Sequence, residues 1–283
     1  MNTSSTRKLM IALVCLAALQ LNTAFAERVE EKADWTERFE ISTDEPVLEI
    51  WNIWGNVTVL PGPDGEISLT IHENRSAPSV GLFDRSLDVY GLAIMADEDS
   101  VVVRVGQRGQ SWHGSDPCRR CRAEYQFVAR VPSNTRVYAS TVNDGFVEIS
   151  DIDGLVSADN VNGPVEINNL SACESVESVN GRVTLTFASA PDSDCYIETI
   201  NGDISIEVPD GAGMDVAADL YNGRMVSEIP VDPVAMPARV KHRESGESHR
   251  YTIEQSAGVR LAGGGPIFNV SSINGDLRIQ KSK

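Results

Sequence analysis

The sequence predicts an all-β protein, a flattened β-solenoid of stacked two-strand repeats with Asn-Gly corners. Two observations lead to this fold class. The dipeptide Asn-Gly recurs along the chain, and apolar residues alternate with polar ones on both sides of it, as in "ESVNGRVTL" and "ETINGDISI". Alternation with period two is typical of β-strands, and a recurrence every ~20 residues is typical of stacked repeats. One repeat therefore reads strand, turn, strand, turn, and each such rung is expected to bury its inward residues against its neighbours.

The predicted corners are the Asn-Gly steps, with Asn143-Asp144-Gly145 as an expanded version. They are Asn162-Gly163, Asn180-Gly181, Asn201-Gly202, Asn222-Gly223 and Asn274-Gly275. An apolar residue stands four places before each Asn, and most steps have apolar residues three and five places after it. We expect a corner to need a positive φ, which Gly adopts without penalty and Asn tolerates better than most residues. The Asn amide can also bond the Asn of the next rung.

Two other architectures were weighed against the solenoid. Asn-Gly is also a hairpin signal, so an antiparallel meander is the alternative within the all-β class. A meander gives no reason for every turn of one class to be identical, and the solenoid is therefore preferred. A helical fold is disfavoured, because apolar residues at helical spacing are absent and Gly, Pro and β-branched residues are spread throughout.

The N-terminus has the pattern of an export signal. Two basic residues precede an apolar run, and "TAFA" at residues 23–26 ends in the small-residue pattern of a signal-peptidase site. Residues 1–26 are therefore predicted to be a signal peptide. No later stretch is apolar enough to cross a bilayer, so we expect no transmembrane segment in the mature chain. The predicted location is the periplasm or the cell surface.

The rest of the chain, residues 27–283, is predicted to be a single β-repeat domain. Its parts are longer strands and loops at 37–131, regular repeats at 132–227, a charged insertion at 228–250 and terminal strands at 251–283. Within the first part, "WNIWGNVTVL" resembles a degenerate first rung. In the last part, "GGGPIFNVSSINGDLRI" is expected to supply the last rung.

Composition excludes one class of partner. The chain has 41 acidic against 24 basic residues and a formal net charge of −17. Binding to nucleic acid requires clustered Lys and Arg, so a nucleic-acid partner is excluded. An acidic exported protein with an envelope protein or glycan as its partner is the plain inference.

Four cysteines follow the predicted cleavage site: Cys118, Cys121, Cys173 and Cys195. An even number in an exported chain predicts disulfides. Cys173 and Cys195 fall on adjacent repeats, where a disulfide can join neighbouring rungs. Cys118 and Cys121, in "CRRC", are expected to close a loop. A redox-active pair or a zinc site with His113 are the alternatives for this second pair.

One row of outward side chains is the candidate binding face. Glu148, Glu166, Thr184 and Ser205 occupy corresponding outward positions of consecutive repeats. Two stacked glutamates also match the spacing of the carboxylates in a retaining glycosidase, which makes a carbohydrate-active enzyme the alternative from a different class. A carboxylate pair without a pocket is not yet a site, however. We therefore expect no catalytic residue, no cofactor and no bound metal.

At its repeats the chain resembles the bacterial putative-adhesin β-repeat family (the DUF4097 type, related to toastrack domains). The resemblance rests on "VNGPVEI", "VNGRVTL", "INGDISI" and the terminal "GGGPIFNVSSINGDLRI", and it covers roughly residues 40–283. It implies an exported structural or adhesin-like binding module of the cell envelope. An envelope-stress accessory protein is the alternative within that class. The family offers no catalytic residues to carry over.

Overall fold

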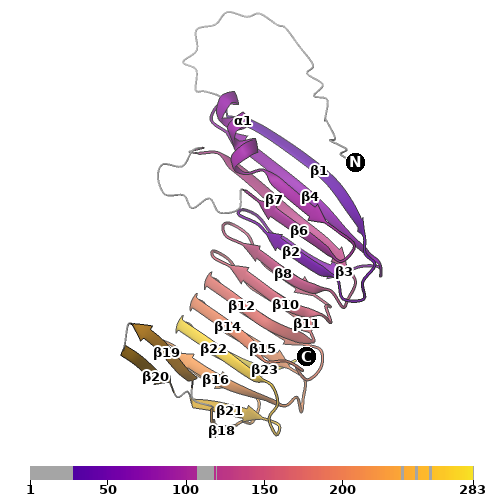
Figure 1. The fold of residues 1–283 in the computed structure, drawn as a ribbon. Helices are drawn as coiled ribbons and strands as arrows, with labels where there is room; N and C mark the ends of the chain where they lie inside the picture. The colour runs from indigo at the N-terminus through magenta and orange to yellow at the C-terminus, as the bar shows by residue number, and fades with distance from the viewer. Residues whose placement is uncertain are drawn as a thin grey trace, which may run out of the picture.

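The computed structural model describes residues 28–106, 118, 120–236, 239–245, 248–254 and 257–282. This part of the chain is nearly all β, with one helix, α1 (Val80–Val89), so the all-β prediction is confirmed for it (Figure 1). Most strands belong to two large mixed sheets, neither of them closed, which are called sheet A and sheet B. The predicted signal peptide, residues 1–26, lies outside the described residues.

Sheet A has ten strands and sheet B has eleven. Sheet A contains, in spatial order, β1 (Val29–Glu40), β4 (Glu66–Ala77), β7 (Arg122–Val131), β3 (Val57–Pro61), β9 (Val147–Ser150), β11 (Val165–Leu170), β13 (Val183–Phe187), β15 (Ile204–Val208), β23 (Leu277–Lys281) and β17 (Met225–Ser227). Sheet B contains β18 (Asp232–Ala235), β21 (Ala257–Leu261), β16 (Met214–Leu220), β22 (Ile267–Asn274), β14 (Cys195–Asn201), β12 (Ala172–Asn180), β10 (Leu155–Asn160), β8 (Arg136–Thr141), β2 (Val47–Trp51), β6 (Ser100–Val105) and β5 (Leu92–Ala96).

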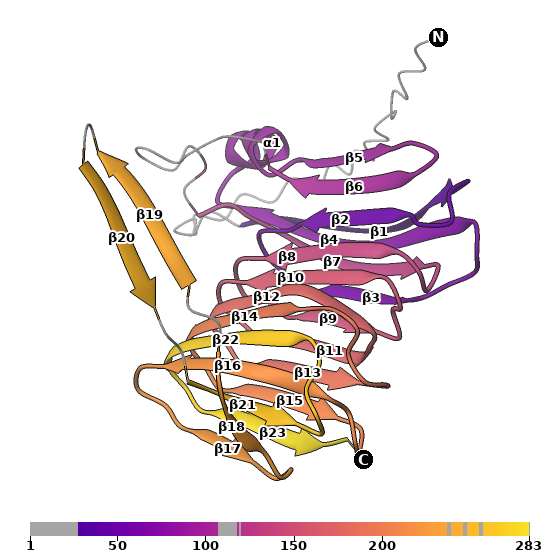
Figure 2. The same cartoon turned by 60° about the horizontal axis from the view of Figure 1, so that its bottom comes forward.

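In its central part the chain alternates between the two sheets. Each strand of sheet B is followed by a strand of sheet A, and we call such a consecutive pair a rung. The rungs are β2–β3, β8–β9, β10–β11, β12–β13, β14–β15, β16–β17 and β22–β23. Neighbouring rungs pair in parallel, as Figure 2 shows for the strands of sheet B. The segment "WNIWGNVTVL" spans the end of β2 and most of β3, and it supplies the first rung as predicted.

The core lies between the sheets and consists of aligned apolar rows. In sheet A the row that begins at Val147 continues through Val165, Val183, Ile204 and Leu277, all fully buried. In sheet B the residue four places before each Asn forms the matching row. Burying an aliphatic side chain of this size stabilises a fold by about 1.5–3 kcal/mol. The alternation recognised in the sequence is therefore the inward face of both sheets.

The glycines of the Asn-Gly steps are required for a reason other than the one predicted. None of the five has a φ in the left-handed region. Instead, a Cβ on Gly181 would lie 1.9 Å from the carbonyl oxygen of Gly163, and a Cβ on Gly202 would lie 1.9 Å from that of Gly181. The same contact recurs at Gly163, Gly223 and Gly275. The expectation of a positive φ is thus wrong, and the close approach of one rung to the next excludes any side chain here.

The asparagines of the same steps form a hydrogen-bonded ladder. The side-chain amide of Asn180 donates to Oδ1 of Asn162 at 3.0 Å, and that of Asn201 donates to Oδ1 of Asn180 at 2.9 Å. The ladder starts at Asn143, which accepts from Asn162, and continues through Asn274 to Asn222. Each amide within the ladder therefore both donates and accepts, a pattern known from stacked in-register strands.

The final rungs do not stack in chain order. Strand β22 pairs with β14 on one side and β16 on the other, and β23 likewise lies between β15 and β17. In Figure 1 the yellow β22 lies between β14 and β16. The C-terminal segment was predicted to supply the last rung, but it is inserted one place earlier. The rung with Asn222 and Gly223 is the outermost one.

Two further expectations differ from the structure. Residues 37–131 were predicted to form strands and loops, yet α1 lies among them, and Ser79 caps this helix through its side chain at the amide of Leu82. The local signals for this helix are the N-cap serine and the inward residues Phe83 and Val89, which one side of a short helix can bury together. The charged stretch 228–250 was predicted as an insertion or loop. It contains β18, and β19 (Arg239–Ser245) pairs antiparallel with β20 (Ser248–Glu254) in a separate two-stranded sheet.

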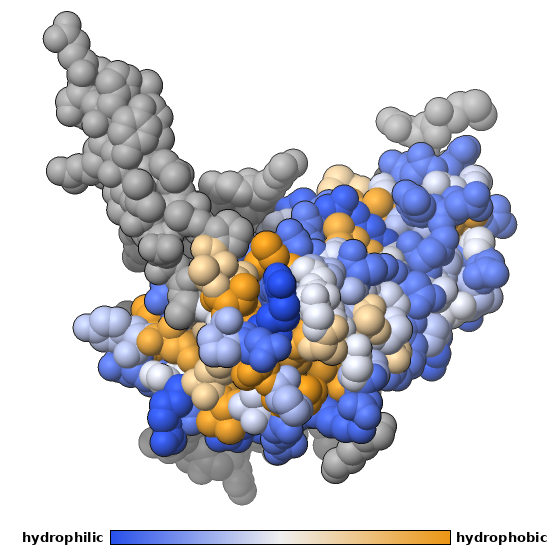
Figure 3. All heavy atoms as spheres, turned by 90° about the horizontal axis from the view of Figure 1, so that it is seen from below, coloured by the Kyte–Doolittle hydropathy of each residue, from blue (hydrophilic) through white to orange (hydrophobic). Residues whose placement is uncertain are grey.

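The end of the stack near β17 exposes apolar side chains (Figure 3). Val226 of β17 is 48% exposed, and Leu220, Met225, Ile229 and Val231 are partly buried there against the core. Sheet A ends at β17, whereas sheet B continues with β21 and β18.

Candidate functional site

The predicted binding row lies on the outer face of sheet A. Glu148 is in register with Glu166, Glu166 with Thr184, and Thr184 with Ser205. The structure therefore brings the four residues together, with neighbouring strands about 4.8 Å apart. Glu148 is half-buried and Glu166 is exposed. Hollows of about 310, 440 and 470 Å³ are lined by other residues.

A second row, on the outer face of sheet B, has more carboxylates. Asp159 of β10 is in register with Glu177 of β12, and Glu177 is in register with Glu198 of β14. We call these three residues the acidic row. In the described part of the chain, no Lys or Arg side chain pairs with any of them. Like charges directly opposite one another on a sheet destabilise it, so the fold tolerates a cost here.

An aromatic and basic cluster adjoins the acidic row at its Asp159 end. The hydroxyl of Tyr138 donates to Oδ2 of Asp159. The ring of Tyr138 packs on Trp51 with 4.3 Å between centroids, and Arg104 lies over Trp51, 4.8 Å from its centroid. Arg104 also pairs with Glu49 at 3.3 Å. Arg104, Trp51 and Tyr138 therefore contact one another and form one packed cluster. Glu177 and Glu198 lie outside this cluster, and both residues are exposed.

The acidic row shifts the pKa values of its members upward. Burial raises the pKa of Asp159, and the hydrogen bond from Tyr138 opposes this only in part. Burial, followed by the charges of Asp159 and Glu198, raises the pKa of Glu177 above its ordinary value of 4.5. Burial and the contact with Asp159 raise the pKa of Tyr138. The row thus favours protons, and by the same electrostatics it favours cations.

Sequence reasoning missed this row, although the signal was present. Asp159, Glu177 and Glu198 each stand three places before an Asn-Gly step. The residue four places before each step was assigned to the core, so its neighbour must point outward.

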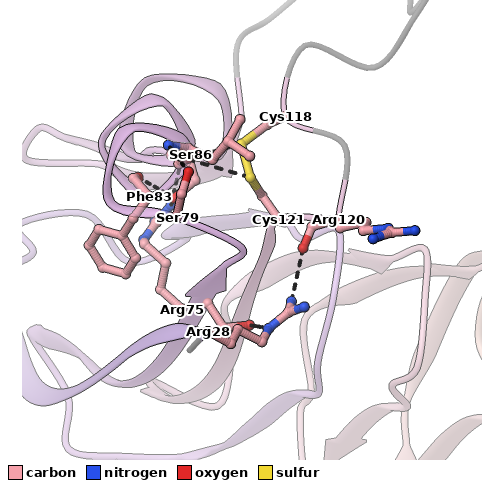
Figure 4. Close-up of a disulfide and its surroundings, with 10 residues drawn as sticks. Arg28, Arg75, Ser79, Phe83, Ser86, Cys118, Arg120 and Cys121 are labelled. Atoms are coloured by element: carbon pink, nitrogen blue, oxygen red, sulfur yellow. Dashed lines mark hydrogen bonds between the residues drawn. A yellow bond between two sulfur atoms is a disulfide. The ribbon is translucent and has the colours of Figure 1, made fainter. Parts of the chain in front are cut away.

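The described cysteines form two disulfides, Cys118–Cys121 and Cys173–Cys195, the pairs expected from the sequence. Cys173 is the second residue of β12 and Cys195 is the first of β14, so this disulfide joins neighbouring rungs with 5.1 Å between Cα atoms. The Cys118–Cys121 disulfide lies beside α1, where Sγ of Cys118 is 3.2 Å from the carbonyl oxygen of Leu82 (Figure 4). Two disulfides fit an exported protein.

No group of three or more His, Cys, Asp or Glu side chains within the described ranges is arranged to hold a metal ion. His113, considered as a zinc ligand, lies outside the described residues. Among the residues the structure describes, no helix is long and apolar enough to span a membrane.

Comparison with known proteins gives likenesses in structure alone. No family model matches the chain, and no curated protein matches it in sequence. A "putative cell adhesion protein" from Clostridium sporogenes is 11% identical, with a TM-score of 0.47, over 89% of this chain and all of that one. A "putative adhesin" from Bacteroides fragilis is 12% identical, with a TM-score of 0.38, over 88% of this chain and 97% of that one. Likenesses of this strength leave the function to be inferred from the chain's own surfaces.

Proposed function

We propose that the protein is an exported, non-catalytic binding module of the cell envelope, built as a flattened β-solenoid with Asn-Gly corners. We further propose that the acidic row binds a protein partner through Lys or Arg side chains. The observation that carries this proposal is the in-register stack of Asp159, Glu177 and Glu198 without a cationic partner in the described part of the chain.

Electrostatics favour a basic protein over a glycan on this face. A Lys or Arg side chain placed between Glu177 and Glu198 would remove their mutual repulsion and gain two charge-assisted hydrogen bonds. A glycan platform instead stacks sugars on open aromatic rings; Trp51 is covered by Arg104 and Tyr138, and the exposed Tyr196 offers one ring on this face, two residues before Glu198. The net charge of −17 also speeds the approach of a basic partner.

The absence of catalysis is part of the proposal. Glu148 and Glu166 lie on the outer face of sheet A, and neither lines one of the three hollows described above. Hydrolysis of an envelope glycan by the purified protein, lost on Glu166→Gln, would contradict it.

The test is capture of partners from an envelope extract by crosslinking to the mature protein. The test variant is Glu177→Lys/Glu198→Lys, and the matched control is Glu148→Lys/Glu166→Lys, which makes the same charge change on the opposite sheet. We expect the first variant to lose a basic protein that the wild type and the control retain. Capture should also weaken as salt rises.

Three outcomes would refute the proposal for the acidic row. If both variants still captured the partner, the charges of the acidic row would have no role in recognition. Loss by the control alone would move the site to the row Glu148, Glu166, Thr184 and Ser205. A glycan as the sole captured partner would refute the protein partner.

A further inference from the structure

At the end of the stack near α1, sheet B is one strand shorter than sheet A. Outward from the β2–β3 rung, sheet A adds β7, β4 and β1, whereas sheet B adds only β6 and β5. In the described part of the chain, no strand of sheet B therefore faces β1. Two adjoining hollows of about 440 and 310 Å³ lie at this place, and both are lined by Glu73, Arg75 and Leu87.

The walls of the larger hollow come from both sheets and the helix. Trp35 and Glu37 project from β1, Leu92 and Ile94 from β5, and Leu87 from α1. Trp35, Leu92 and Ile94 are only partly buried, although each packs against the core. The inner face of β1 thus combines apolar side chains with Glu31 and Glu37, and within the described residues no strand of sheet B lies opposite it.

Within the described residues, strand β5 has backbone groups beside the hollow that no other strand bonds. The amide of Asp97 donates to Ser100 at 3.0 Å, and the amide of Gly106 donates to Gly91 at 2.8 Å. In an antiparallel pair, bonded and non-bonded residues alternate. The backbone groups of Leu92 and Ile94 therefore point away from β6, toward the free edge of the sheet.

The charge of the two hollows is negative. Arg75 uses all five of its N–H groups within the protein, on Glu73, Ser86, Tyr90 and Tyr125. It therefore cannot bind an anion without losing one of these bonds. Glu31, Glu37 and Asp84 also line the hollows, and none of the three pairs with a described Lys or Arg. The lining consequently suits a cationic group.

We propose that this end of the molecule is a peptide-binding groove, separate from the acidic row. An extended segment of a partner protein adds to the free edge of β5 as the strand missing from sheet B. Its backbone bonds Leu92 and Ile94, its inward apolar side chains pack beside the side chains of these two residues, and an inward Lys or Arg reaches Glu37. Strand addition to a sheet edge takes its affinity from main-chain bonds and its specificity from pockets for alternate side chains.

The test uses a synthetic peptide, Val-Thr-Lys-Thr-Val-Thr-Lys-Thr-Val, and a counterpart with Glu at both Lys positions. Binding of the fluorescein-labelled peptides to the mature protein is measured by fluorescence anisotropy. We expect the Lys peptide to bind and the Glu peptide not to bind. Equal binding of the two peptides, or no binding of the Lys peptide at concentrations of about 1 mM, would overturn the proposal.

Two variants separate the charge from the backbone edge. Glu37→Lys should lower the affinity for the Lys peptide at least about fivefold, because one charge-assisted hydrogen bond is lost. Its control is Glu40→Lys on the outer face of the same strand, which should bind like the wild type. Ile94→Pro removes the backbone N–H of residue 94, which points to the edge of the sheet and does not bond β6, so the β5–β6 pair is preserved. This variant should weaken binding of the Lys peptide by a similar factor.

Each of these outcomes is decisive once thermal unfolding shows that the variants are folded. Wild-type affinity in Glu37→Lys, or an equal loss in Glu40→Lys, would refute recognition of the cation by this groove. Wild-type affinity in Ile94→Pro would refute strand addition.

Discussion

The two edges of the stack are built on different principles. At the Asn-Gly edge, the next strand begins three residues after each Asn, and every corner touches its neighbours through glycine contacts and asparagine bonds. At the opposite edge the turns differ in length, and left-handed residues occur at Asp151 (φ 58°) and Asn169 (φ 54°). At the Asn-Gly edge, left-handed residues occur at Gly55 (φ 101°) and Asp144 (φ 50°), in the two irregular corners that precede the five Asn-Gly steps. The conformation of the Asn-Gly corners is therefore determined by contacts between neighbouring rungs. The conformation of each turn at the opposite edge is determined by its own backbone.

The largest expected effect tests the glycine contact. Gly202→Ala places a Cβ 1.9 Å from the carbonyl oxygen of Gly181, which only movement of the backbone can relieve. We expect a loss of more than about 3 kcal/mol in the free energy of unfolding, measured by urea titration.

The control lies at the opposite edge. Gly211 has a φ of +80° and no atom near the position of an added Cβ. Gly211→Ala should therefore cost only about 1 kcal/mol, the penalty of the conformation alone. Equal losses in the two variants would remove the distinction between the edges.

The next effect concerns the disulfide near the variable edge. Replacing Cys173 and Cys195 together by Ser opens a loop with a sequence separation of 22 and should cost about 3 kcal/mol by the chain-entropy account. The same change at Cys118 and Cys121, with a separation of 3, should cost about 2 kcal/mol. Chemical unfolding of both double variants measures this, and the reverse order would contradict it.

A smaller effect tests the asparagine ladder. Asn180 donates to Asn162 and accepts from Asn201, whereas Asn222 at the end of the ladder makes one such bond, to Asn274. Asn180→Ala should lower the free energy of unfolding by about 2 kcal/mol and Asn222→Ala by about 1 kcal/mol. Identical losses would show that the amides do not act as a ladder.

The smallest expected change in the free energy of unfolding concerns the acidic row, which lies between the two edges of the stack. A raised carboxyl pKa means that folded Glu177 binds its proton more tightly than the unfolded chain does. Its contribution to stability is therefore full at low pH and falls as pH rises upward from 4.5. Glu177→Gln should raise stability by about 0.5 kcal/mol at neutral pH and by less at about pH 4.

The matched control for this prediction is Glu207→Gln. Glu207 is in register with Thr186 and Gln280, so it has no carboxylate directly opposite. Thermal unfolding at both pH values should show little gain for this variant. A gain at neutral pH equal to that of Glu177→Gln would refute repulsion within the row.

Local patterns predicted the parts of the fold that are repeated. The apolar residues before and after the steps are buried as expected except at Asn222-Gly223, where Ala218 and Met225 are only partly buried. Period-two alternation marks an inward face whatever the neighbours are. The row Glu148, Glu166, Thr184 and Ser205 could be aligned for the same reason, since it follows the step at a constant distance.

Contacts between distant segments could not be predicted in this way. The role of the glycines depends on the distance between rungs, which no single repeat contains. The place of β22 depends on a choice between two equivalent positions, beside β14 or beyond β16, and the Asn274-Gly275 step fits either. The groove beside β5 depends on a strand that sheet B lacks, and a missing strand leaves no pattern in the sequence.

The position of β22–β23 also fixes the order in which the chain can assemble. A chain that emerges N-terminus first can add rungs in sequence as far as β14–β15. The next segment, β16–β17, carries the same Asn-Gly step, but its final neighbour is β22–β23, which has not yet been synthesised. The outer part of the stack therefore reaches its native neighbours only after residues 267–281 are available, so β16–β17 must wait for a rung that follows it in the chain.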